Sequence, residues 1–584
     1  MCGIAGVIAK PGARADEAFV LAMIERLSHR GPDGIRVERL GGSVVAHARL
    51  SIIDLEGGWQ PLHGAGSTVI GNGEIYNYLE LMSEFGLKEK MATVADFEPL
   101  LHLYRDEGPA ALKRLRGMYA LCLMGVDGRV FLARDPFGIK PLYLKDLPDG
   151  LAFASEPRAF GEPEPTKGAD ELLALHYRLD GVRQLAPGEV VEVVDGRARR
   201  FDTLPRLARA PVRSRDSEAM LLKRLDKVLE NAVMVHQRSD VPYGLFLSGG
   251  IDSTAIAALM ARLSDKPVTA FTCGFTAPDA ADERAKAEKV AKALDLDWRE
   301  TTFTEEDFWR IAPEVAWALD DPTTDFACLP TYKLAEAAKD TLTVVLSGEG
   351  GDELFAGYGR YRRAQRSRWL GGRPAEPQLD APYLVDGGEG ALRFWRARGK
   401  APKGLTPLQE AQWADMATWL PNDLLLKLDR CLMAHGLEGR TPFLDREVAA
   451  FAFSLPDNLK VRGRMGKWLL RQWLAEHCPA AEPFARKQGF TVPVAHFIAP
   501  WASEIGHRVA ACPGVAALAA PEAVARIFND EDEAERRWPL LFYALWWTIH
   551  VAGATPAEAL TALGGPTGVV KTPPRPRPVA SVIV

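Results

Sequence analysis

Short apolar runs separated by Gly, Asp and Pro turns fill the first third of the chain. Four of these runs lie at residues 3–8, 44–47, 119–124 and 130–133. Apolar runs of this length between turn formers are typical of buried strands. The pattern therefore predicts a strand-rich unit that ends near residue 201.

The hydrophobic period changes after a basic, proline-bearing stretch at residues 204–216. Apolar residues then recur at helical spacing, namely Leu221, Leu222, Leu225, Val228 and Leu229. A second helical run covers 255–263, and strand-like runs lie at 243–247, 268–271 and 342–346. Alternating helices and strands, with glycine-rich turns after strands, predict a doubly wound parallel α/β sheet.

We therefore predict two domains, of α/β and α+β class, that are joined by a linker. The expected segments are an N-terminal unit at 1–203, a linker at 204–216, a C-terminal unit at 217–555 and a tail at 556–584. Beyond about residue 369 the C-terminal unit has a mostly helical pattern. The proline-rich tail cannot bury a core, so we expect it to be disordered.

Composition narrows the classes of partner. A formal net charge of -6 and a pI near 6.1 argue against nucleic acid or an anionic membrane surface. No apolar run reaches the roughly 18–20 residues of a membrane span, and the N-terminus lacks a signal-peptide pattern. The seven cysteines include no CxxC pair, which excludes a zinc site or disulfide framework of the usual spacing. We expect a cytoplasmic globular protein with no nucleic-acid or membrane partner.

The chain opens Met1-Cys2-Gly3-Ile4. Removal of Met1 is expected, because the side chain of Cys2 is small. The α-amino group of Cys2 would then have a pKa of about 7.7–8.0 and could act as base for the thiol of the same residue. Taken alone, an ordinary buried thiol is the more frequent explanation of such a cysteine.

Three nearby motifs supply groups that recognition of an amino acid needs. They are Arg30-Gly-Pro-Asp-Gly, His47-Ala-Arg-Leu-Ser-Ile-Ile-Asp and Asn72-Gly-Glu-Ile-Tyr-Asn. Arg49 can clamp a carboxylate bidentately, and Asn72 with the Gly73 amide can stabilise an oxyanion. Glu74 and Asp96 can pair with an ammonium group. An arginine and two acids suit an α-amino acid, and glutamine is one that carries a hydrolysable amide.

These motifs resemble the class II glutamine amidotransferases, which are N-terminal-nucleophile hydrolases with an αββα sandwich. The resemblance continues through Arg134-Asp-Pro-Phe-Gly-Ile-Lys-Pro-Leu-Tyr and Phe153-Ala-Ser-Glu, so it covers nearly the whole first domain. It implies that Cys2 is the nucleophile. The glutamine pocket that it implies is lined by Arg49, Leu50, Ser51, Ile52, Ile53, Asn72, Gly73, Glu74 and Asp96.

One stretch departs from that family. Thr93-Val94-Ala95 precedes Asp96, where the family often has Gly-Ser-Asp or a close variant. The carboxylate is retained, whereas Val94 is bulkier and the hydroxyl is lost. This departure predicts an altered local turn and is compatible with slower glutamine turnover.

A strand-to-helix turn, Ser248-Gly-Gly-Ile-Asp-Ser, follows the run at 243–247. Backbone amides at a helix start, with hydroxyl groups beside them, cradle phosphate oxygens. An ordinary strand–helix turn would explain a lone Gly-Gly pair, but this motif is more specific, and the chain has no Walker Gly-Lys-Ser/Thr. It resembles the ATP pyrophosphatases, in which a carboxylate attacks the α-phosphorus to give an acyl-adenylate and pyrophosphate.

A second glycine-rich turn, Ser347-Gly-Glu-Gly-Gly-Asp-Glu, follows the run at 342–346. We expect the two turns to face each other across the carboxyl edge of the sheet. Asp252 and Asp352 are the candidate Mg²⁺ ligands. Helix capping is the alternative explanation of the acids in the second turn.

Two later segments, Leu437-Glu-Gly-Arg-Thr-Pro-Phe-Leu-Asp and Gly466-Lys-Trp-Leu-Leu-Arg, resemble the substrate-side helix and the catalytic-lysine segment of the glutamine-hydrolysing asparagine synthetases. The resemblance to that family spans Met1 to roughly Trp547. It implies that Lys467 stabilises the transition state at the α-phosphate; a surface lysine on an amphipathic helix is the alternative. The implied ATP contacts are Leu247, Ser248, Gly249, Gly250, Asp252, Ser253, Cys273, Ser347 and Gly348.

The resemblance implies a coupled reaction in which glutamine, aspartate and ATP, with Mg²⁺, give asparagine, glutamate, AMP and pyrophosphate. Ammonia would pass between the domains through a shielded passage. A homodimer is left open. Three alternatives also stay open: a relative of the same architecture that acts on another carboxylate, a non-catalytic binding module, and a glutaminase uncoupled from synthesis. We expect residues 371–403 to carry any divergence in substrate.

Overall fold

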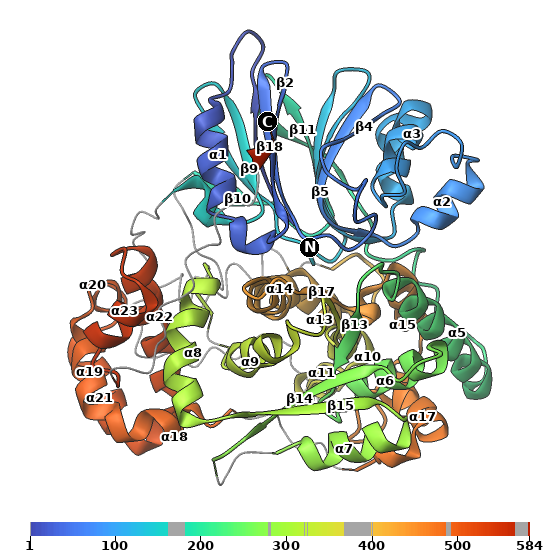
Figure 1. The fold of residues 1–584 in the computed structure, drawn as a ribbon. Helices are drawn as coiled ribbons and strands as arrows, with labels where there is room; N and C mark the ends of the chain where they lie inside the picture. The colour runs from blue at the N-terminus through green and yellow to red at the C-terminus, as the bar shows by residue number, and fades with distance from the viewer. Residues whose placement is uncertain are drawn as a thin grey trace.

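A computed structural model describes residues 2–161, 181–277, 282–320, 322–323, 325–366, 399, 401–485 and 492–566, together with the backbone of 582–583. Figure 1 shows a strand-rich N-terminal domain stacked on a C-terminal domain in which helices surround one sheet. No helix within these ranges is long and apolar enough to cross a membrane.

Two sheets packed face to face form the N-terminal domain. The first has the order β10 (Val182–Gln184), β8 (Tyr143–Leu147), β9 (Gly150–Ala154), β1 (Gly3–Ala9), β3 (Ser43–Arg49), β2 (Gly34–Leu40) and β18 (Val582–Ile583). The second has the order β12 (Arg197–Thr203), β11 (Glu189–Val194), β7 (Val130–Arg134), β6 (Gly117–Met124), β5 (Ser67–Ile75) and β4 (Leu62–Gly64). Helix α1 (Glu17–Glu25) covers the first sheet, and α2 (Tyr78–Glu84) and α3 (Glu98–Glu107) lie beside the second. This is the predicted αββα sandwich.

Strand β1 shows why the sequence folds in this way. Its side chains alternate between two cores, as a period of two requires. Ile4 and Ile8 pack between the sheets, whereas Ala5 and Val7 pack under α1. Because both faces are buried, the strand is apolar throughout, and its first residues place Cys2 at the end of the sandwich that faces the C-terminal domain.

A five-stranded parallel sheet forms the centre of the C-terminal domain, as predicted. Its order is β15 (Asp297–Phe303), β14 (Thr269–Phe275), β13 (Tyr243–Phe246), β16 (Val344–Leu346) and β17 (Glu438–Arg440). The chain builds outward from β13 to β15 and then returns to add β16 and β17 on the other side. The topological switch point therefore lies between β13 and β16, where doubly wound folds bind ligands.

Helices cover both faces of this sheet and enclose two cores. One core includes α5 (Glu218–His236), α6 (Ile251–Leu263), α15 (Arg446–Ser454) and α17 (Trp468–His477). The other includes α8 (Glu305–Ala318), α9 (Cys328–Ala338), α19 (Ala502–Ala511), α21 (Pro521–Asn529) and α22 (Arg537–His550). Further helices are α7 (Arg284–Ala293), α10 (Gly351–Phe355), α11 (Gly359–Ala364), α13 (Pro407–Ala417), α14 (Leu425–Met433), α16 (Asp457–Lys460), α18 (Val494–Ile498), α20 (Pro513–Ala516) and α23 (Pro556–Ala562).

The structure differs from the predicted tail at its start. Helix α23 falls inside the stretch that we expected to be disordered, and its Ala559 and Leu560 are buried. A capping box between Thr555 and Glu558 begins this helix, which stabilises a short helix that also packs on α8. The prediction underestimated how much apolar surface precedes Gly564. Residues 567–581 lie outside the described residues.

Candidate active sites

Cys2 lies against two elements of the predicted glutamine pocket. Its backbone nitrogen, which becomes the α-amino group if Met1 is removed, donates to Asn72 Oδ1 at 3.2 Å. Its Sγ donates to the Leu50 carbonyl at 3.7 Å. Burial raises the pKa of the Cys2 thiol. A thiol with a raised pKa is protonated at neutral pH, so attack on an amide requires a base within reach.

Asn72 and Gly73 on β5 have the properties of oxyanion donors. Asn72 is fully buried, and its Nδ2 has no hydrogen-bond partner among the described residues. A buried donor without a partner is costly unless a ligand receives it. Gly73 has φ +138°, and a Cβ there would lie 1.9 Å from the Met118 carbonyl oxygen. Only glycine fits at this position.

Arg49 ends β3 with its guanidinium held from two sides. Nη2 donates to the Asp54 carbonyl at 2.5 Å, and the guanidinium lies 4.8 Å from the centre of the Trp59 ring. Burial lowers the pKa of Arg49. Nη1 is buried without a hydrogen-bond partner among the residues that the structure describes. A ligand carboxylate would accept from Nη1 and supply a counter-charge for the guanidinium.

Glu74 and Asp96 form a buried acidic pair at the predicted ammonium end of the pocket. The Ile75 amide donates to Asp96 Oδ2 at 2.6 Å. Burial raises the pKa of Asp96 to about 7, and burial together with Asp96 raises the pKa of Glu74 well above its ordinary value. An ammonium group between the two carboxylates would remove this penalty.

The stretch before Asp96 keeps an ordered turn despite its departure from the family pattern. Val94 is 58% exposed, whereas Glu74 and Asp96 are buried. The amide of Val94 donates to Asp54 Oδ2 at 3.0 Å, and the Ala95 amide donates to Thr93 Oγ1 at 3.2 Å. A hydroxyl is therefore present two positions earlier than expected, and it accepts a hydrogen bond within the turn.

The segment from Leu50 to Ile53 lies where the two domains meet. Leu50 and Ile52 belong to the same hydrophobic cluster as α5 and α17 of the C-terminal domain, and Ile53 packs against it. The Ser51 amide donates to Asp33 Oδ2 at 2.7 Å, and the Asp240 amide donates to the Ile52 carbonyl at 2.9 Å. The segment predicted to line the glutamine pocket is thus anchored in the other domain.

The first phosphate loop joins β13 to α6. Ser248 and Ser253 contact each other through their hydroxyls at 3.0 Å, and the Gly250 amide donates to Ser248 Oγ at 3.2 Å. Gly249 has φ +68°. These contacts fold the loop tightly at the start of a thirteen-residue helix, where amides and the helix dipole favour an anion.

The second loop packs directly on the first, as predicted. A Cβ at Gly348 would lie 2.9 Å from the Ser253 amide nitrogen, and a Cβ at Gly351 would lie 2.5 Å from Asp252 Oδ1. Both glycines are needed because a larger residue would push the loops apart. Leu247 directly precedes the first loop, and its amide donates to the Phe271 carbonyl of β14. Cys273 lies two residues further along β14. Burial raises the pKa of Cys273 to about 12, so its thiol stays neutral.

Lys467 bridges the two loops. Its Nζ contacts Asp252 Oδ2 and lies 2.6 Å from Asp352 Oδ1. Burial opposes the charge, but the two carboxylates raise the pKa of Lys467 overall. Its side chain is 4% exposed, which rules out the surface-lysine alternative.

The same two carboxylates suit Mg²⁺. Magnesium prefers hard oxygen ligands and is usually held by one or two carboxylates together with substrate phosphates. Within the described part of the chain no group of three or more His, Cys, Asp or Glu could hold a metal by itself. The donor set therefore fits a metal that arrives with phosphate, with Asp252 and Asp352 as its protein ligands.

The segment from Leu437 to Asp445 is a strand followed by a short turn, which corrects the expected helix. It forms β17 and a 3-10 turn at Pro442–Leu444. Pro442 disfavours helical geometry at Thr441, and β16 offers a parallel partner for Glu438–Arg440. The strand passes between the two sites: the Ser347 amide donates to the Arg440 carbonyl at 2.8 Å.

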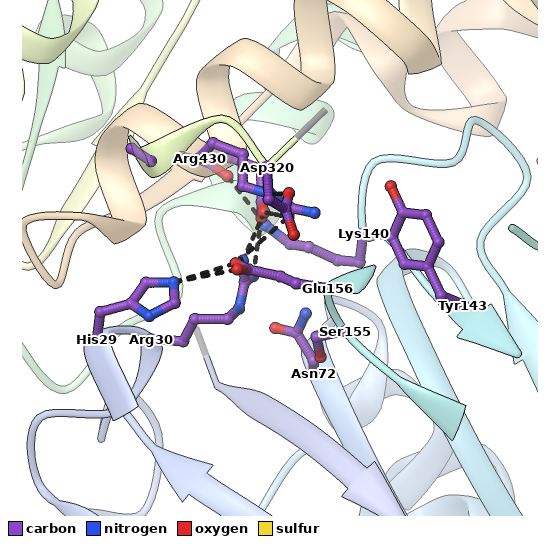
Figure 2. A network of polar contacts seen from close by, with 12 residues as sticks. His29, Arg30, Asn72, Lys140, Tyr143, Ser155, Glu156, Asp320 and Arg430 are labelled. Atoms are coloured by element: carbon purple, nitrogen blue, oxygen red, sulfur yellow. Dashed lines mark hydrogen bonds and ion pairs between the residues drawn. The ribbon is translucent and has the colours of Figure 1, made fainter. Parts of the chain in front are cut away.

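A buried ionic network joins the domains (Figure 2) and was not predicted. Arg30 Nη1 donates to Glu156 Oε1 at 2.5 Å and to Asp429 Oδ2 at 2.8 Å. Arg430 Nε donates to Asp320 Oδ1 at 2.9 Å. The motifs that contain Arg30 and Glu156 could have marked these two residues as candidates. Their partners could not be found in this way, because α14 and the stretch after α8 contain no motif.

A second unpredicted cluster lies beside the second loop. Lys427 Nζ donates to Asp325 Oδ2 at 2.8 Å and lies 3.9 Å from Glu349 Oε1. Thr323 donates to Asp423 at 2.8 Å, and burial raises the pKa of Asp423 to about 8. One lysine among three acids leaves this region suited to a substrate that carries a positive charge as well as a carboxylate.

Comparison with known proteins gives two matches that together cover most of the chain. The profile of the glutamine amidotransferase domain family matches residues 1–201. The asparagine synthase family profile matches residues 224–549.

Curated relatives match along nearly the full length. Glutamine-hydrolysing asparagine synthetase 1 of Bacillus subtilis is 31% identical over 94% of this chain and 97% of its own. Glutamine-hydrolysing asparagine synthetase B of Escherichia coli is 28% identical over 84% of this chain and 82% of its own. A Mycobacterium tuberculosis protein that carries the same name provisionally is 33% identical over 94% of this chain and 97% of its own.

Proposed function

The chain belongs to the asparagine synthase family and carries a glutamine amidotransferase domain, and we propose that it makes asparagine from aspartate, ATP and glutamine. Water and these three substrates would give asparagine, AMP, pyrophosphate and glutamate. The observation that carries the proposal is the meeting of Lys467, Asp252 and Asp352 at the switch point of the parallel sheet. A buried lysine held between two such loops supports a reaction at a phosphate, where a fixed cation stabilises developing negative charge.

The N-terminal site would release ammonia. Arg49 Nη1 receives the α-carboxylate of glutamine, and the pair Glu74 and Asp96 receives its ammonium. The Cys2 thiol loses its proton to the α-amino group and attacks the side-chain amide carbon. Asn72 Nδ2 and the Gly73 amide stabilise the oxyanion. Ammonia leaves as the thioester forms, and water then releases glutamate.

The C-terminal site would activate aspartate. Its β-carboxylate attacks the α-phosphorus of ATP and pyrophosphate leaves. Lys467 stabilises the charge that builds on the phosphoryl oxygens. When bound, Mg²⁺ neutralises the departing pyrophosphate, and Asp252 and Asp352 are the residues that would hold it. Ammonia then attacks the β-aspartyl adenylate, which releases AMP.

Ammonia must cross between the domains as the neutral molecule, because ammonium is not a nucleophile. The elements at the boundary are buried, including the Arg30 network and Leu50, which excludes bulk water from this region. We also propose a cytoplasmic location, since all seven cysteines are free thiols.

A substrate screen tests the proposal. Pyrophosphate release is followed with glutamine or ammonium present and with aspartate or other carboxylates as acceptor. Aspartate-dependent release that yields asparagine is expected. Release with another acid and none with aspartate would move the chain to an enzyme of the same architecture with a different acceptor.

A further inference from the structure

The glutamine pocket contains a side chain from the other domain. Arg440 lies on β17 of the C-terminal sheet, and its Nη2 is 3.1 Å from Oε1 of Glu74 on β5. Both side chains are buried, with Arg440 at 0% exposure. Because this ion pair is buried, the charge and the orientation of the Glu74 carboxylate depend on the side chain at position 440.

Arg440 is fixed on its own side of the boundary. Its Nε donates to Glu438 Oε1 at 2.6 Å, and its Nη1 donates to the carbonyls of His236 at 2.8 Å and Arg238 at 2.6 Å. Its backbone carbonyl is held by the Ser347 amide. These contacts hold the guanidinium in place independently of Glu74. The Glu74 carboxylate therefore lies against a cation whose position is already fixed.

Glu74 needs a nearby cation to stay ionised in its buried, acidic surroundings. Burial is the main cause that raises the pKa of Glu74, and the carboxylates of Asp96 and Glu438 raise it further. Arg440 is the nearby side-chain cation that lowers it. Glu438 itself is held ionised, with a pKa of about 2, because the α-amino group of the chain, Arg440 and Lys140 together outweigh its burial. Without Arg440, Glu74 would face two acids and no side-chain counter-charge of this kind.

We propose that Arg440 is a positioning residue of the glutamine site, supplied by the synthetase domain, which orients the Glu74 carboxylate toward the ammonium group of the substrate. This inference rests on the proposed function, because it takes Glu74 as a glutamine ligand. It assigns part of the recognition of glutamine to a domain that does not hydrolyse it.

Glutamate release from glutamine without ATP, measured across pH 6–9, tests the inference on the full chain. In Arg440→Gln the KM for glutamine should rise about tenfold at pH 7 while kcat stays within about threefold. The excess in KM should shrink as pH rises, because Glu74 then ionises unaided. Ammonium-dependent synthesis should be retained. Arg446→Gln is the matched control: this arginine also crosses the boundary, to the carbonyls of Lys113 and Leu115, and its loss should leave the KM unchanged.

Three results would overturn the inference: a KM within twofold of wild type in Arg440→Gln, an equal rise in Arg446→Gln, or a fall in kcat with no change in KM. If Arg440→Gln does not fold, the KM of Arg440→Lys tests the inference instead. Lysine keeps the charge but cannot make the contacts that fix the guanidinium, so its KM should rise about threefold, and a wild-type KM would contradict the proposed role. Wild-type protein that releases no glutamate would reject the proposed function itself.

Discussion

At the scale of single residues, the predicted glutamine pocket holds buried polar groups that a substrate would satisfy. Arg49 and Asn72 each have a buried donor atom that no described residue accepts. Burial is the main cause that raises the pKa values of Glu74 and Asp96, and neighbouring carboxylates raise them further. We propose that this pocket is organised for the two ends of an amino acid before either end arrives, which lowers the cost of reorganisation on binding.

The acid pair predicts how glutamine binding depends on pH. Asp96 has a pKa of about 7 without ligand, and the substrate ammonium favours its ionised form, so binding releases a proton below pH 7. The KM for glutamine should rise by up to about tenfold per pH unit as pH falls below 7. Initial rates of glutamate release between pH 5.5 and 8.5 measure this. In Asp96→Asn the slope should become shallower, and an unchanged slope would show that another group titrates.

Cys2 predicts a separation of the two half-reactions. Cys2→Ala should abolish glutamine-dependent synthesis and glutamate release, because it removes the proposed nucleophile beside Asn72 and Leu50. Ammonium-dependent synthesis should stay within about threefold of wild type, since the nucleotide loops are unaffected. Asparagine formation from each nitrogen source provides the measurement. A loss of both activities would show that the sites are not separate.

At the scale of elements, the close contact of the two phosphate loops controls the geometry of Asp252. Gly351→Ala would place a Cβ 2.5 Å from Asp252 Oδ1 in the present geometry, so the carboxylate must move. We expect pyrophosphate release to fall by about tenfold to a hundredfold, with glutamate release unchanged. Gly359→Ala, on the neighbouring helix α11, has its nearest contact at the flexible end of Arg362 and serves as the control.

Lys467 predicts a larger effect on the same step. Lys467→Met removes the cation between the loops, and aspartate-dependent pyrophosphate release should fall by about two to three orders of magnitude. The KM for glutamine should not change. A comparable loss of glutaminase activity would indicate a structural role instead.

Much of this geometry could be predicted from sequence because it is local. The alternation in β1 and the glycines after β13 and β16 encode strands and loops within a few residues of each other. The partners of Arg30 and Glu74 could not be predicted, because Asp429 and Arg440 are brought to them by the packing of a distant helix and strand. The helix expected after Leu437 was wrong because β16 offers a pairing edge that only the assembled sheet provides.

At the scale of the whole molecule, the two domains share a buried ionic boundary (Figure 2). Arg30, Glu156, Asp429 and Arg430 are each almost fully buried. Partners in such a network are costly to remove singly, since the remaining charges stay buried. The boundary therefore fixes the orientation of the two sites, and Arg440 and Leu50 extend it into the glutamine pocket.

Asp429→Asn tests this boundary. It leaves Arg30 and Arg430 short of one counter-charge, so the free energy of unfolding should fall by about 3 kcal/mol. The yield of asparagine per glutamate released should also fall, because a loosened boundary admits water. Denaturant unfolding and the ratio of the two products measure these effects. Full stability together with full coupling would show that the network is dispensable.

Transfer of nitrogen inside one molecule is the central claim, and isotope tracing tests it most directly. Wild-type protein receives aspartate, MgATP and glutamine labelled with nitrogen-15 at the side-chain amide, with unlabelled ammonium in excess. We predict one pyrophosphate for each asparagine, and an asparagine amide that carries the label despite the competing ammonium. Pyrophosphate release that does not depend on aspartate, or asparagine that carries only unlabelled nitrogen, would contradict the claim.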